Sequence, residues 1–363
     1  MLLYQIGLTL LPGVGDVLGK KLVAYCGGVE EVFRQSRKSL EKIPGIGVKL
    51  VDSIVNQKVL FRAEEEIRFI EKYNITPLFY LDKKYPARLK NCDDGPIMLF
   101  FKGNADMNVA RVVSMVGTRK ATDYGKSVCE KIIEDLKAYG ILVISGLAYG
   151  IDTCAHRAAL EQNLMTVAVL GHGLDMIYPY LNRHLAEKMV DQGGLLTEFM
   201  SKTKPDRENF PRRNRIIAGL ADATIVIEAA KTGGALITAE IANSYSRDVF
   251  SVPGRIGDPW SEGCNSLIKT NKAALVQRAA DVAYIMGWEK QGVAQPRQRE
   301  LFVELTDDES KIVAVLRQQE STGIDLVYLN SGLPASKVAA TLLNLEFRGL
   351  VRALPGKMYK LEM

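Results

Sequence analysis

The sequence predicts an α/β protein with a mainly parallel central sheet and a small module at each end. Three observations support this fold class. Apolar strand-like runs alternate with amphipathic helical patterns from about residue 109 to 288, which is typical of parallel sheets. A glycine-containing pentapeptide occurs twice near the start of the chain, and three helical patterns followed by a hairpin pattern end it. A chain of 363 residues is long enough for several such cores.

The composition is that of an ordinary globular protein, with 47% apolar and 25% charged residues. The net charge of +5 is modest for this length, so binding of a polyanion has to depend on local clusters of cations. Five cysteines without a CxxC pair indicate a reduced protein without a structural zinc. Because there is no signal-peptide pattern and no apolar run near the roughly 20 residues of a membrane span, we expect a cytoplasmic protein.

Residues 1–60 contain an internal repeat. Leu11-Pro12-Gly13-Val14-Gly15 recurs as Ile43-Pro44-Gly45-Ile46-Gly47, and each copy separates two helical patterns. The repeat resembles a tandem helix-hairpin-helix domain. Two glycines one residue apart allow a tight turn and leave amide N–H groups at a helix N-terminus, where a phosphate can bind. DNA contact and a purely structural role are equal alternatives here, with slight support for DNA from three nearby lysines: Lys20, Lys21 and Lys49.

Residues 61–108 are expected to form a connector. A charged helix from Arg62 to Tyr73 is followed by short strand-like and turn pieces around Tyr85-Pro86 and Gly95-Pro96. Nothing in this segment indicates chemistry.

Residues 109–288 are predicted to contain six strands with helices between them: Val112–Val116, Leu142–Ser145, Thr166–Leu170, Leu195–Phe199, Thr224–Ile227 and Val249–Val252. The strands of a parallel sheet point the same way, so the loops that follow them meet at one edge, where ligands bind in open α/β folds. Segments with glycines and cations fall near these strand ends: Gly117-Thr118-Arg119, Gly146, Arg212-Arg213-Asn214-Arg215 and Lys231-Thr232-Gly233-Gly234. We expect them to form one basic groove that holds phosphate.

The arginine cluster is predicted to lie on a helix. Arg212 and Arg215 are three residues apart and share a face, whereas Arg213 points about 100° away, so Arg212 and Arg215 are the favoured phosphate ligands. Lys231 to Gly234 lead into a helix from Ala235 to Tyr245, and its first amides can meet an anion. Taken alone, that segment has an alternative as a simple glycine turn with a solvated lysine.

Other motifs do not indicate a catalytic site. Gly171-His172-Gly173-Leu174-Asp175-Met176 has Met where a dinucleotide fingerprint needs glycine, and the segment before Gly125-Lys126-Ser127 lacks the first glycine of a nucleotide-hydrolase loop. Asp152 and Asp175 are expected to cap helices rather than to bind a metal. We therefore predict no cofactor, no metal and no catalytic residue. Four aromatic residues near the groove either stack bases or pack locally: Tyr149, Tyr178, Tyr180 and Phe210.

The end of the chain is predicted to be a polar linker, residues 289–305, and a winged-helix domain, residues 306–363. Its hairpin comprises Leu350–Ala353 and Met358–Leu361 with a turn at Pro355-Gly356. In a DNA-binding winged helix, the third helix would present Lys337, Asn344 and Arg348 to a groove. That helix is not notably basic, so contact with a protein is at least as well supported.

The ordered motifs of the α/β region are similar to those of the DprA/Smf family of DNA-processing proteins. They are Gly117-Thr118-Arg119, residues 145–152, residues 171–175 with Tyr178-Pro179 and Asn182, Phe210 with Arg213-Asn214-Arg215, residues 231–234 with Thr238-Ala239, and Val252-Pro253-Gly254 with Gly263 and Asn265. The resemblance implies an extended Rossmann-like domain that binds single-stranded DNA and forms a homodimer. It also implies a non-enzymatic protein that protects incoming DNA and loads the RecA recombinase during natural transformation.

By motif position, the resemblance assigns DNA binding to Arg119 and Lys231, and also to Arg213-Asn214-Arg215. Thr118 stands where the family usually has serine and keeps the hydroxyl, whereas the frequent KSGS loop loses its second hydroxyl in Lys231-Thr232-Gly233-Gly234. The alternative is a nucleotide-phosphate-binding hydrolase similar to the lysine-decarboxylase-like Rossmann group, with Glu240 as the acid. That group has a PGGxGT-type loop, whose proline is replaced here.

Overall fold

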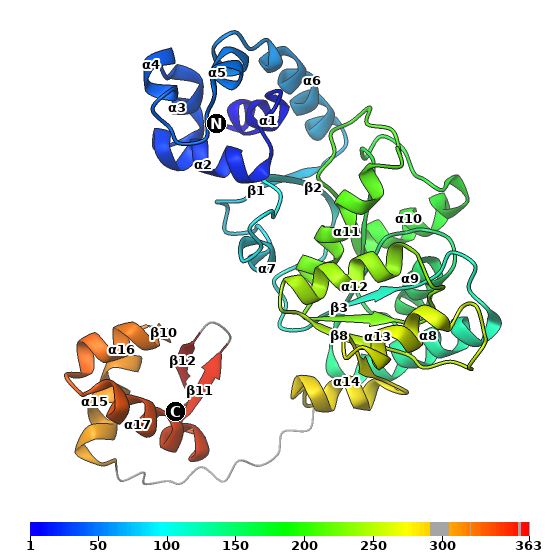
Figure 1. Ribbon diagram of the computed structural model, residues 1–363, viewed down its shortest axis with the longest axis vertical. Helices are drawn as coiled ribbons and strands as arrows, with labels where there is room; N and C mark the ends of the chain where they lie inside the picture. Colours follow the sequence, from blue (N-terminus) through cyan, green and yellow to red (C-terminus); the bar gives the residue numbers. More distant parts are fainter. Residues whose placement is uncertain (291–304, 320, 355–356, 363) are drawn as a thin grey trace. The chain divides into compact units, whose positions relative to one another are not determined.

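The computed structural model describes residues 1–290, 305–319, 321–354 and 357–362 (Figure 1). The chain divides into two compact units, residues 1–293 and 294–363. Most of the predicted linker, residues 289–305, lies outside the described residues, as does the predicted turn at Pro355-Gly356.

The first unit begins with six helices: α1 (Leu2–Leu10), α2 (Asp16–Cys26), α3 (Val29–Arg34), α4 (Arg37–Leu40), α5 (Val48–Val55) and α6 (Val59–Lys72). The two predicted hairpins connect α1 to α2 and α4 to α5. Gly13 and Gly45 have φ values of +80° and +86°, which L side chains rarely adopt. Each hairpin is bound by the other repeat, because Lys21 donates to the Pro44 carbonyl and Ser53 donates to the Pro12 carbonyl. The predicted tandem repeat is confirmed.

A sheet of nine strands follows: β1 (Thr76–Phe79), β2 (Met98–Gly103), β3 (Val112–Val116), β4 (Leu142–Ser145), β5 (Thr166–Val169), β6 (Gly193–Thr197), β7 (Ala223–Val226), β8 (Asp248–Ser251) and β9 (Ala274–Leu275). Their order is β1-β2-β6-β5-β4-β3-β7-β8-β9. All neighbours from β6 to β9 are parallel, as predicted, and β2 pairs antiparallel with both β1 and β6.

Two of the strands come from the segment expected to be a connector. The expected turns lie at Tyr85 and Gly95, on either side of the short helix α7 (Ala87–Lys90), and β2 begins two residues after Pro96, whereas β1 precedes this stretch. β2 is apolar and largely buried because it lies between β1 and β6. β6 starts at Gly193 rather than at the predicted Leu195. Gly193 and Gly194 pair with β5 and β2 at positions where a Cβ would collide with backbone atoms, and glycine pairs of this kind do not resemble strand sequence.

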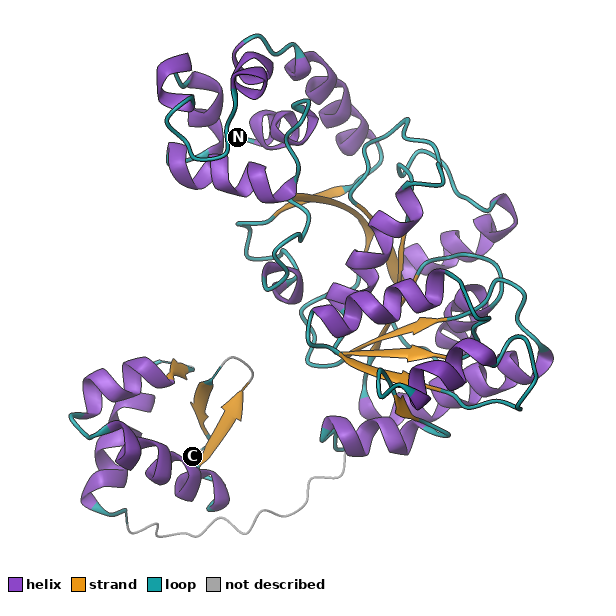
Figure 2. Cartoon of the chain, in the orientation of Figure 1, coloured by secondary structure: helices purple, strands orange, loops and turns teal. Residues whose placement is uncertain are grey.

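Helices cover both faces of the sheet (Figure 2). α8 (Asp123–Leu136), α9 (Ile151–Glu161), α10 (Arg183–Asp191) and α14 (Ala279–Met286) pack on one face. α11 (Asn209–Leu220), α12 (Gly234–Ser244) and α13 (Glu262–Lys269) pack on the other. The chain runs from β3 outward to β6 and then returns to the opposite side of β3 as β7. The carboxyl ends of β3 and β7 are therefore a topological switch point, where open α/β sheets bind ligands.

The second unit contains α15 (Asp307–Leu316), β10 (Thr322–Gly323), α16 (Ile324–Ser331), α17 (Ala335–Phe347), β11 (Val351–Leu354) and β12 (Met358–Leu361). Its strands form a sheet in the order β10-β12-β11. The predicted core residues Val338, Leu342 and Leu345 are buried. This is the predicted winged helix.

Candidate functional site

A pocket of about 680 Å³ lies at the switch point between β3 and β7. The loops after both strands line it, together with the first half of α11. Eight of the residues that the sequence places in the groove are in its lining: Gly117, Thr118, Arg119, Arg213, Asn214, Thr232, Gly233 and Gly234. Four are not: Gly146, Arg212, Arg215 and Lys231. The expectation that distant segments meet at one edge of the sheet therefore holds for the eight lining residues. We call this cavity the switch-point pocket.

The loop after β3 is fixed by a buried carboxylate. Glu228 is 2% exposed, and its side chain accepts hydrogen bonds from the Thr122 amide, at 2.9 Å, and from the Thr122 hydroxyl. The Glu228 carbonyl accepts from the Thr118 amide at 2.8 Å. These contacts hold the segment that carries Arg119 against the end of β7. Sequence analysis missed Glu228, because a single glutamate after a strand has no distinguishing pattern.

Arg213 forms part of the pocket wall. It is 4% exposed and donates to the carbonyls of Gly146 and Val169. Gly146 has no room for a side chain, since a Cβ there would lie 2.2 Å from Arg213 Nη1. Burial lowers the pKa of Arg213 to about 10, so the guanidinium stays protonated at neutral pH. The role of Gly146 is thus to seat a charged arginine inside the fold.

Asp152 lies in the same pocket, against expectation. It does not cap α9, whose N-cap is Gly150; its carboxylate accepts from the Ala148 amide at 3.3 Å. Burial raises its pKa, while the charge of Arg213 opposes that shift. Asp175 is not a helix cap either, because it accepts from the Lys202 amide at 2.9 Å. The pocket therefore contains a titratable acid beside its buried cation.

Phe210 brings the charged groups of the pocket together. The guanidinium carbon of Arg119 lies 5.5 Å from the Phe210 ring centroid, and that of Arg213 lies 6.0 Å from it. The Tyr178 ring is 6.1 Å away. Cations at these distances are attracted to the face of an aromatic ring. The other two predicted aromatic residues, Tyr149 and Tyr180, are exposed and do not line the switch-point pocket.

The loop after β7 supplies the opposite wall. α12 begins at Gly234 with Gly233 as its N-cap, so the free amides of its first turn and the positive end of its dipole lie at the pocket. Lys231 is exposed and adjoins Thr232, which lines the pocket. Asn214 Nδ2 donates to the Gly234 carbonyl at 3.3 Å and ties α11 to this loop. Arg207 and Trp260 also line the pocket and had no sequence signal beyond their residue type.

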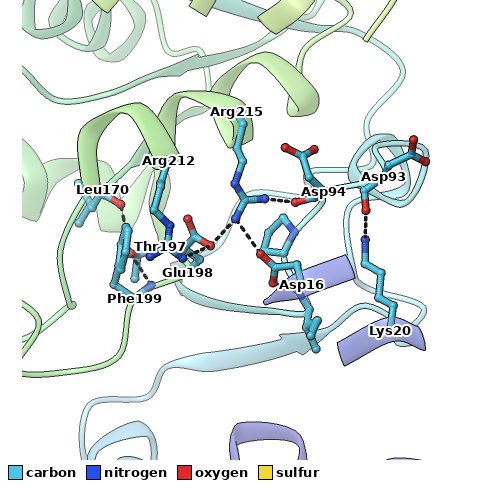
Figure 3. A network of polar contacts seen from close by, with 12 residues as sticks. Asp16, Lys20, Asp93, Asp94, Leu170, Thr197, Glu198, Phe199, Arg212 and Arg215 are labelled. Carbon is cyan, nitrogen blue, oxygen red and sulfur yellow. Dashed lines mark hydrogen bonds and ion pairs between the residues drawn. The ribbon is translucent and has the colours of Figure 1, made fainter. Parts of the chain in front are cut away.

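Arg212 and Arg215 face away from the switch-point pocket, which corrects the sequence prediction. They share a helix face, as expected, but it is directed toward the N-terminal helices (Figure 3). Arg215 is ion-paired with Glu198 and, at 3.1 Å, with Asp16 of α2. Arg212 Nη2 lies 3.7 Å from Glu198 Oε2. The helical period gave the right grouping, but the packing of α11 on the sheet directs Arg213 rather than this pair to the pocket.

Lysines near the first hairpin are also occupied by structural contacts. Lys20 donates to the Asp93 carbonyl at 3.3 Å, and burial lowers its pKa. Lys21 binds the second hairpin, as described above, and Asp16 places a carboxylate at the start of α2. In the winged helix, Lys337 pairs with Asp308 and Arg348 pairs with Glu309, both at 2.9 Å. These contacts weaken the case for phosphate binding at either end module.

Comparison with known proteins identifies the family. A family model described as DNA recombination-mediator protein A matches residues 76–287. The chain belongs to this family. Models of a SAM-like helix-hairpin-helix tandem and of the DprA winged helix domain match residues 6–57 and 296–357. The family resemblance found from sequence motifs is therefore confirmed, and the chain is related to DNA-processing proteins.

Relatives match this member of the family over most of its length. Protein Smf of Synechocystis is 34% identical over 98% of both chains. DNA processing protein DprA of Streptococcus pneumoniae is 43% identical over 56% of this chain and 71% of its own. The solved structure of the S. pneumoniae protein has a TM-score of 0.69 at 33% identity and covers 80% of this chain and 99% of that one.

A second solved structure is that of DNA processing protein A from Helicobacter pylori, reported for its single-stranded DNA binding mode. It has a TM-score of 0.54 at 24% identity and covers 60% of this chain and 98% of its own, which shows a shared fold.

The described part of the chain holds neither a metal-binding cluster nor a helix that could span a membrane. Within residues 1–290, 305–319, 321–354 and 357–362, no cluster of three or more His, Cys, Asp or Glu side chains could hold a metal ion. Over the same residues, no helix is both long and apolar enough to cross a membrane.

Proposed function

We propose that the switch-point pocket binds single-stranded DNA without a catalytic step. The observation that carries this proposal is the arrangement of Arg119 and Arg213 around the Phe210 ring, beside the N-terminus of α12. The guanidinium groups and the helix amides supply phosphate ligands, and the ring supplies a surface on which a base can stack. Lys231 adds a further cation at the exposed side of Thr232.

A single strand fits this pocket better than a duplex. Bases of a duplex are stacked on one another and cannot reach an aromatic ring in a recessed pocket, whereas the bases of a single strand can. Phosphate and stacking contacts of this kind do not distinguish one base from another, so binding has little sequence preference. The proposal agrees with the single-stranded DNA binding reported for the H. pylori relative.

We propose a finer role as well, which membership of the family supports. The protein holds and protects incoming single strands in the cytoplasm as a homodimer and loads RecA on them during natural transformation. In this proposal the bound strand is not cleaved or modified.

The hydrolase alternative has less support. Its proposed acid, Glu240, is 62% exposed, pairs with Lys272 at 3.0 Å and is not part of the pocket lining. A general acid has to be within hydrogen-bond reach of its substrate.

Measurements of DNA binding and of RecA assembly test the proposal. Arg119→Ala and Lys231→Ala should each weaken binding of unrelated single strands, and each should reduce the slope of log affinity against log salt by about 0.7, the value for one phosphate contact. Lys131→Ala, at an exposed lysine of α8 that pairs with Glu134 and does not line the pocket, is the matched control. Wild type, but not the Arg119 and Lys231 variants, should speed RecA assembly on the strand. Normal binding by both variants would refute the assignment, and turnover of nucleotides by the pure protein would favour the hydrolase.

A further inference from the structure

Trp260 is an aromatic residue of the switch-point pocket that takes no part in a hydrophobic core. It lies in the loop between β8 and α13 and lines the pocket together with Ile237 and Thr238 of α12. Its side chain is partly exposed, and it belongs to none of the hydrophobic clusters formed by the described residues. Tryptophan normally contributes its large apolar area to a core or an interface. One that stands at a pocket without core contacts is available to a ligand.

The indole of Trp260 also lacks a polar or aromatic partner. Among the described residues, no other ring and no cation stacks on it. In the same part of the chain, its N–H has no hydrogen-bond acceptor, and that nitrogen is not buried. A tryptophan N–H usually finds a partner when it is buried. The ring and its N–H are therefore both open to the pocket or to solvent.

Phe210, the other large aromatic ring of the pocket, is already surrounded. Three groups lie within 6.1 Å of its ring centroid, namely the guanidinium groups of Arg119 and Arg213 and the ring of Tyr178. These neighbours leave less of the Phe210 ring for a base than Trp260 offers. The pocket thus has one aromatic ring that organises cations and a second that is unoccupied.

Hydrogen bonds fix the loop that carries Trp260. The Trp260 amide donates to the Asp258 side chain at 3.1 Å, and the Trp260 carbonyl accepts from the Ala229 amide at 2.8 Å. Asn265 closes the loop, because its side chain exchanges two hydrogen bonds of 3.1 Å with the Gly254 backbone. Since the loop is held in place by these bonds, stacking of a ligand on Trp260 does not have to order it, which would cost affinity.

The position of Trp260 also suits the phosphate of a nucleotide. Ala229, which is bonded to Trp260, follows β7, and the chain runs on from it to the N-terminus of α12. Ala229, Thr232, Gly233 and Gly234 all line the pocket, and α12 has no side-chain cap that would occupy its first amides. A phosphate at these amides and a base on Trp260 would lie on adjoining parts of one wall.

We propose that Trp260 is the platform on which one base of the bound single strand stacks, beside a phosphate held at the N-terminus of α12. This inference rests on the proposed function and assigns a nucleobase subsite within it. Stacking uses the flat face of a base and does not read its hydrogen-bonding edge, so any of the four bases can occupy the subsite. A base inside a duplex cannot, because its neighbours cover both of its faces.

Intrinsic fluorescence tests this proposal in the full-length protein, because the chain has two tryptophans. Trp288 is the matched control: it packs against a hydrophobic core, has Arg111 5.9 Å from its ring centroid and does not line the pocket. Saturation with oligothymidylate should quench the fluorescence of Trp288→Phe, in which Trp260 alone reports. It should leave the fluorescence of Trp260→Phe unchanged. The corresponding duplex should quench neither variant.

Affinity measurements give the contribution of the stacked base. Trp260→Ala should bind single strands about tenfold more weakly than wild type, in the range for one stacked base. Its slope of log affinity against log salt should be unchanged, because no phosphate contact is lost. Trp260→Phe keeps an aromatic face and should recover much of the affinity. Urea unfolding followed by Trp288 fluorescence checks that Trp260→Ala is folded.

The outcomes separate this subsite from the proposed function. Unchanged Trp260 fluorescence in the saturated complex would overturn the subsite, and so would wild-type affinity of Trp260→Ala while Arg119→Ala binds weakly. A shallower salt slope for Trp260→Ala would show that its loop supports a phosphate contact rather than a base, and would also overturn it. Normal binding by both Arg119→Ala and Lys231→Ala would instead refute the proposed function.

Discussion

The two faces of α11 carry arginines that are two residues apart and have different surroundings. Arg213 is buried at the switch-point pocket, where it donates to backbone carbonyls and has one acid, Asp152, nearby. Arg215 is 11% exposed on the opposite face and is bound by Glu198, Asp16 and the Asp94 carbonyl. The comparison shows that a cationic residue in the sequence is not always free to bind a ligand, because carboxylates of the protein can neutralise it. An arginine between two carboxylates joins parts of the protein, whereas one held by carbonyls keeps its positive field for an anion.

The largest expected effect concerns the face of α11 that carries Arg215. Arg215→Ala leaves Glu198 buried without its main partner, and removal of one member of a buried pair typically lowers the free energy of unfolding by about 3–5 kcal/mol. Both tryptophans, Trp260 and Trp288, lie in the first unit, so fluorescence during urea unfolding reports its stability. Arg183→Ala, which removes an exposed pair with Glu187, should change stability by less than about 0.5 kcal/mol. A stable Arg215→Ala protein would contradict the distinction between the faces.

The next effect concerns Gly146, which leaves room for the Arg213 side chain. Gly146→Ala places a Cβ 2.2 Å from Arg213 Nη1 and 2.6 Å from its Cζ, so the guanidinium has to move. We expect a loss of about 1–3 kcal/mol in stability and weaker binding of single strands by the protein that remains folded. Gly28→Ala is the matched control, because its Cβ would meet no heavy atom within 4 Å and Gly28 lies outside the switch-point pocket. Equal effects of the two changes in both assays would show that Arg213 is not positioned by Gly146.

A smaller effect concerns the acid at the pocket. Burial raises the pKa of Asp152, and protonation of this group removes a negative charge next to Arg213. Single-strand affinity should therefore rise as pH falls through that raised pKa. Asp152→Asn should bind several-fold more tightly than wild type at neutral pH, because one opposing charge is absent, and its affinity should depend less on pH. Fluorescence anisotropy titrations at a series of pH values measure both. Weaker binding by the Asn variant would place Asp152 among the groups that hold the strand.

The smallest effect concerns Glu198, the partner of Arg215. Burial raises the pKa of Glu198 in the folded protein above that of the unfolded chain. The folded state therefore binds this proton more tightly, and the resulting stability is present below the ordinary glutamate pKa, about 4.3, and is lost as pH rises through the raised value. As the pH rises through this pKa, the unfolding free energy of wild type should therefore fall relative to that of Glu198→Gln. A constant difference across the range would mean that Glu198 titrates normally.

Much of the fold could be predicted from the sequence. The alternation of strands and helices gave all six central strands, because their burial on both faces makes them short continuous apolar runs. The segment of β1 and β2 was expected to hold only short strand-like pieces of a connector. Its place in the main sheet was not foreseen, because β2 pairs antiparallel with β6 across about 90 residues, which has no local signal, and β1 joins the sheet only through β2. The start of β6 was missed for a similar reason, since Gly193 and Gly194 are required by the neighbouring backbones rather than by strand propensity.

The candidate site was predictable to the level of loops but not of side chains. Parallel topology requires the segments of Arg119 and of residues 231–234 to meet, because β3 and β7 are neighbours with the same direction. The choice between Arg213 and Arg215 was wrong, because the helical period specifies which residues share a face and not which way that face points. Glu228 and Asp152 were missed as site residues, since their importance arises from contacts between distant segments.

The sequence by itself determined the family, the order of the three modules and the loops that meet at the switch point, because these depend on local periodicity, glycine positions and motif order along the chain. Only the tertiary structure decided which cations are available to a ligand. Neutralisation of Arg215 and exposure of Arg119 depend on where Asp16, Glu198 and Glu228 arrive in space, and electrostatic energy depends on distance and burial rather than on separation along the chain.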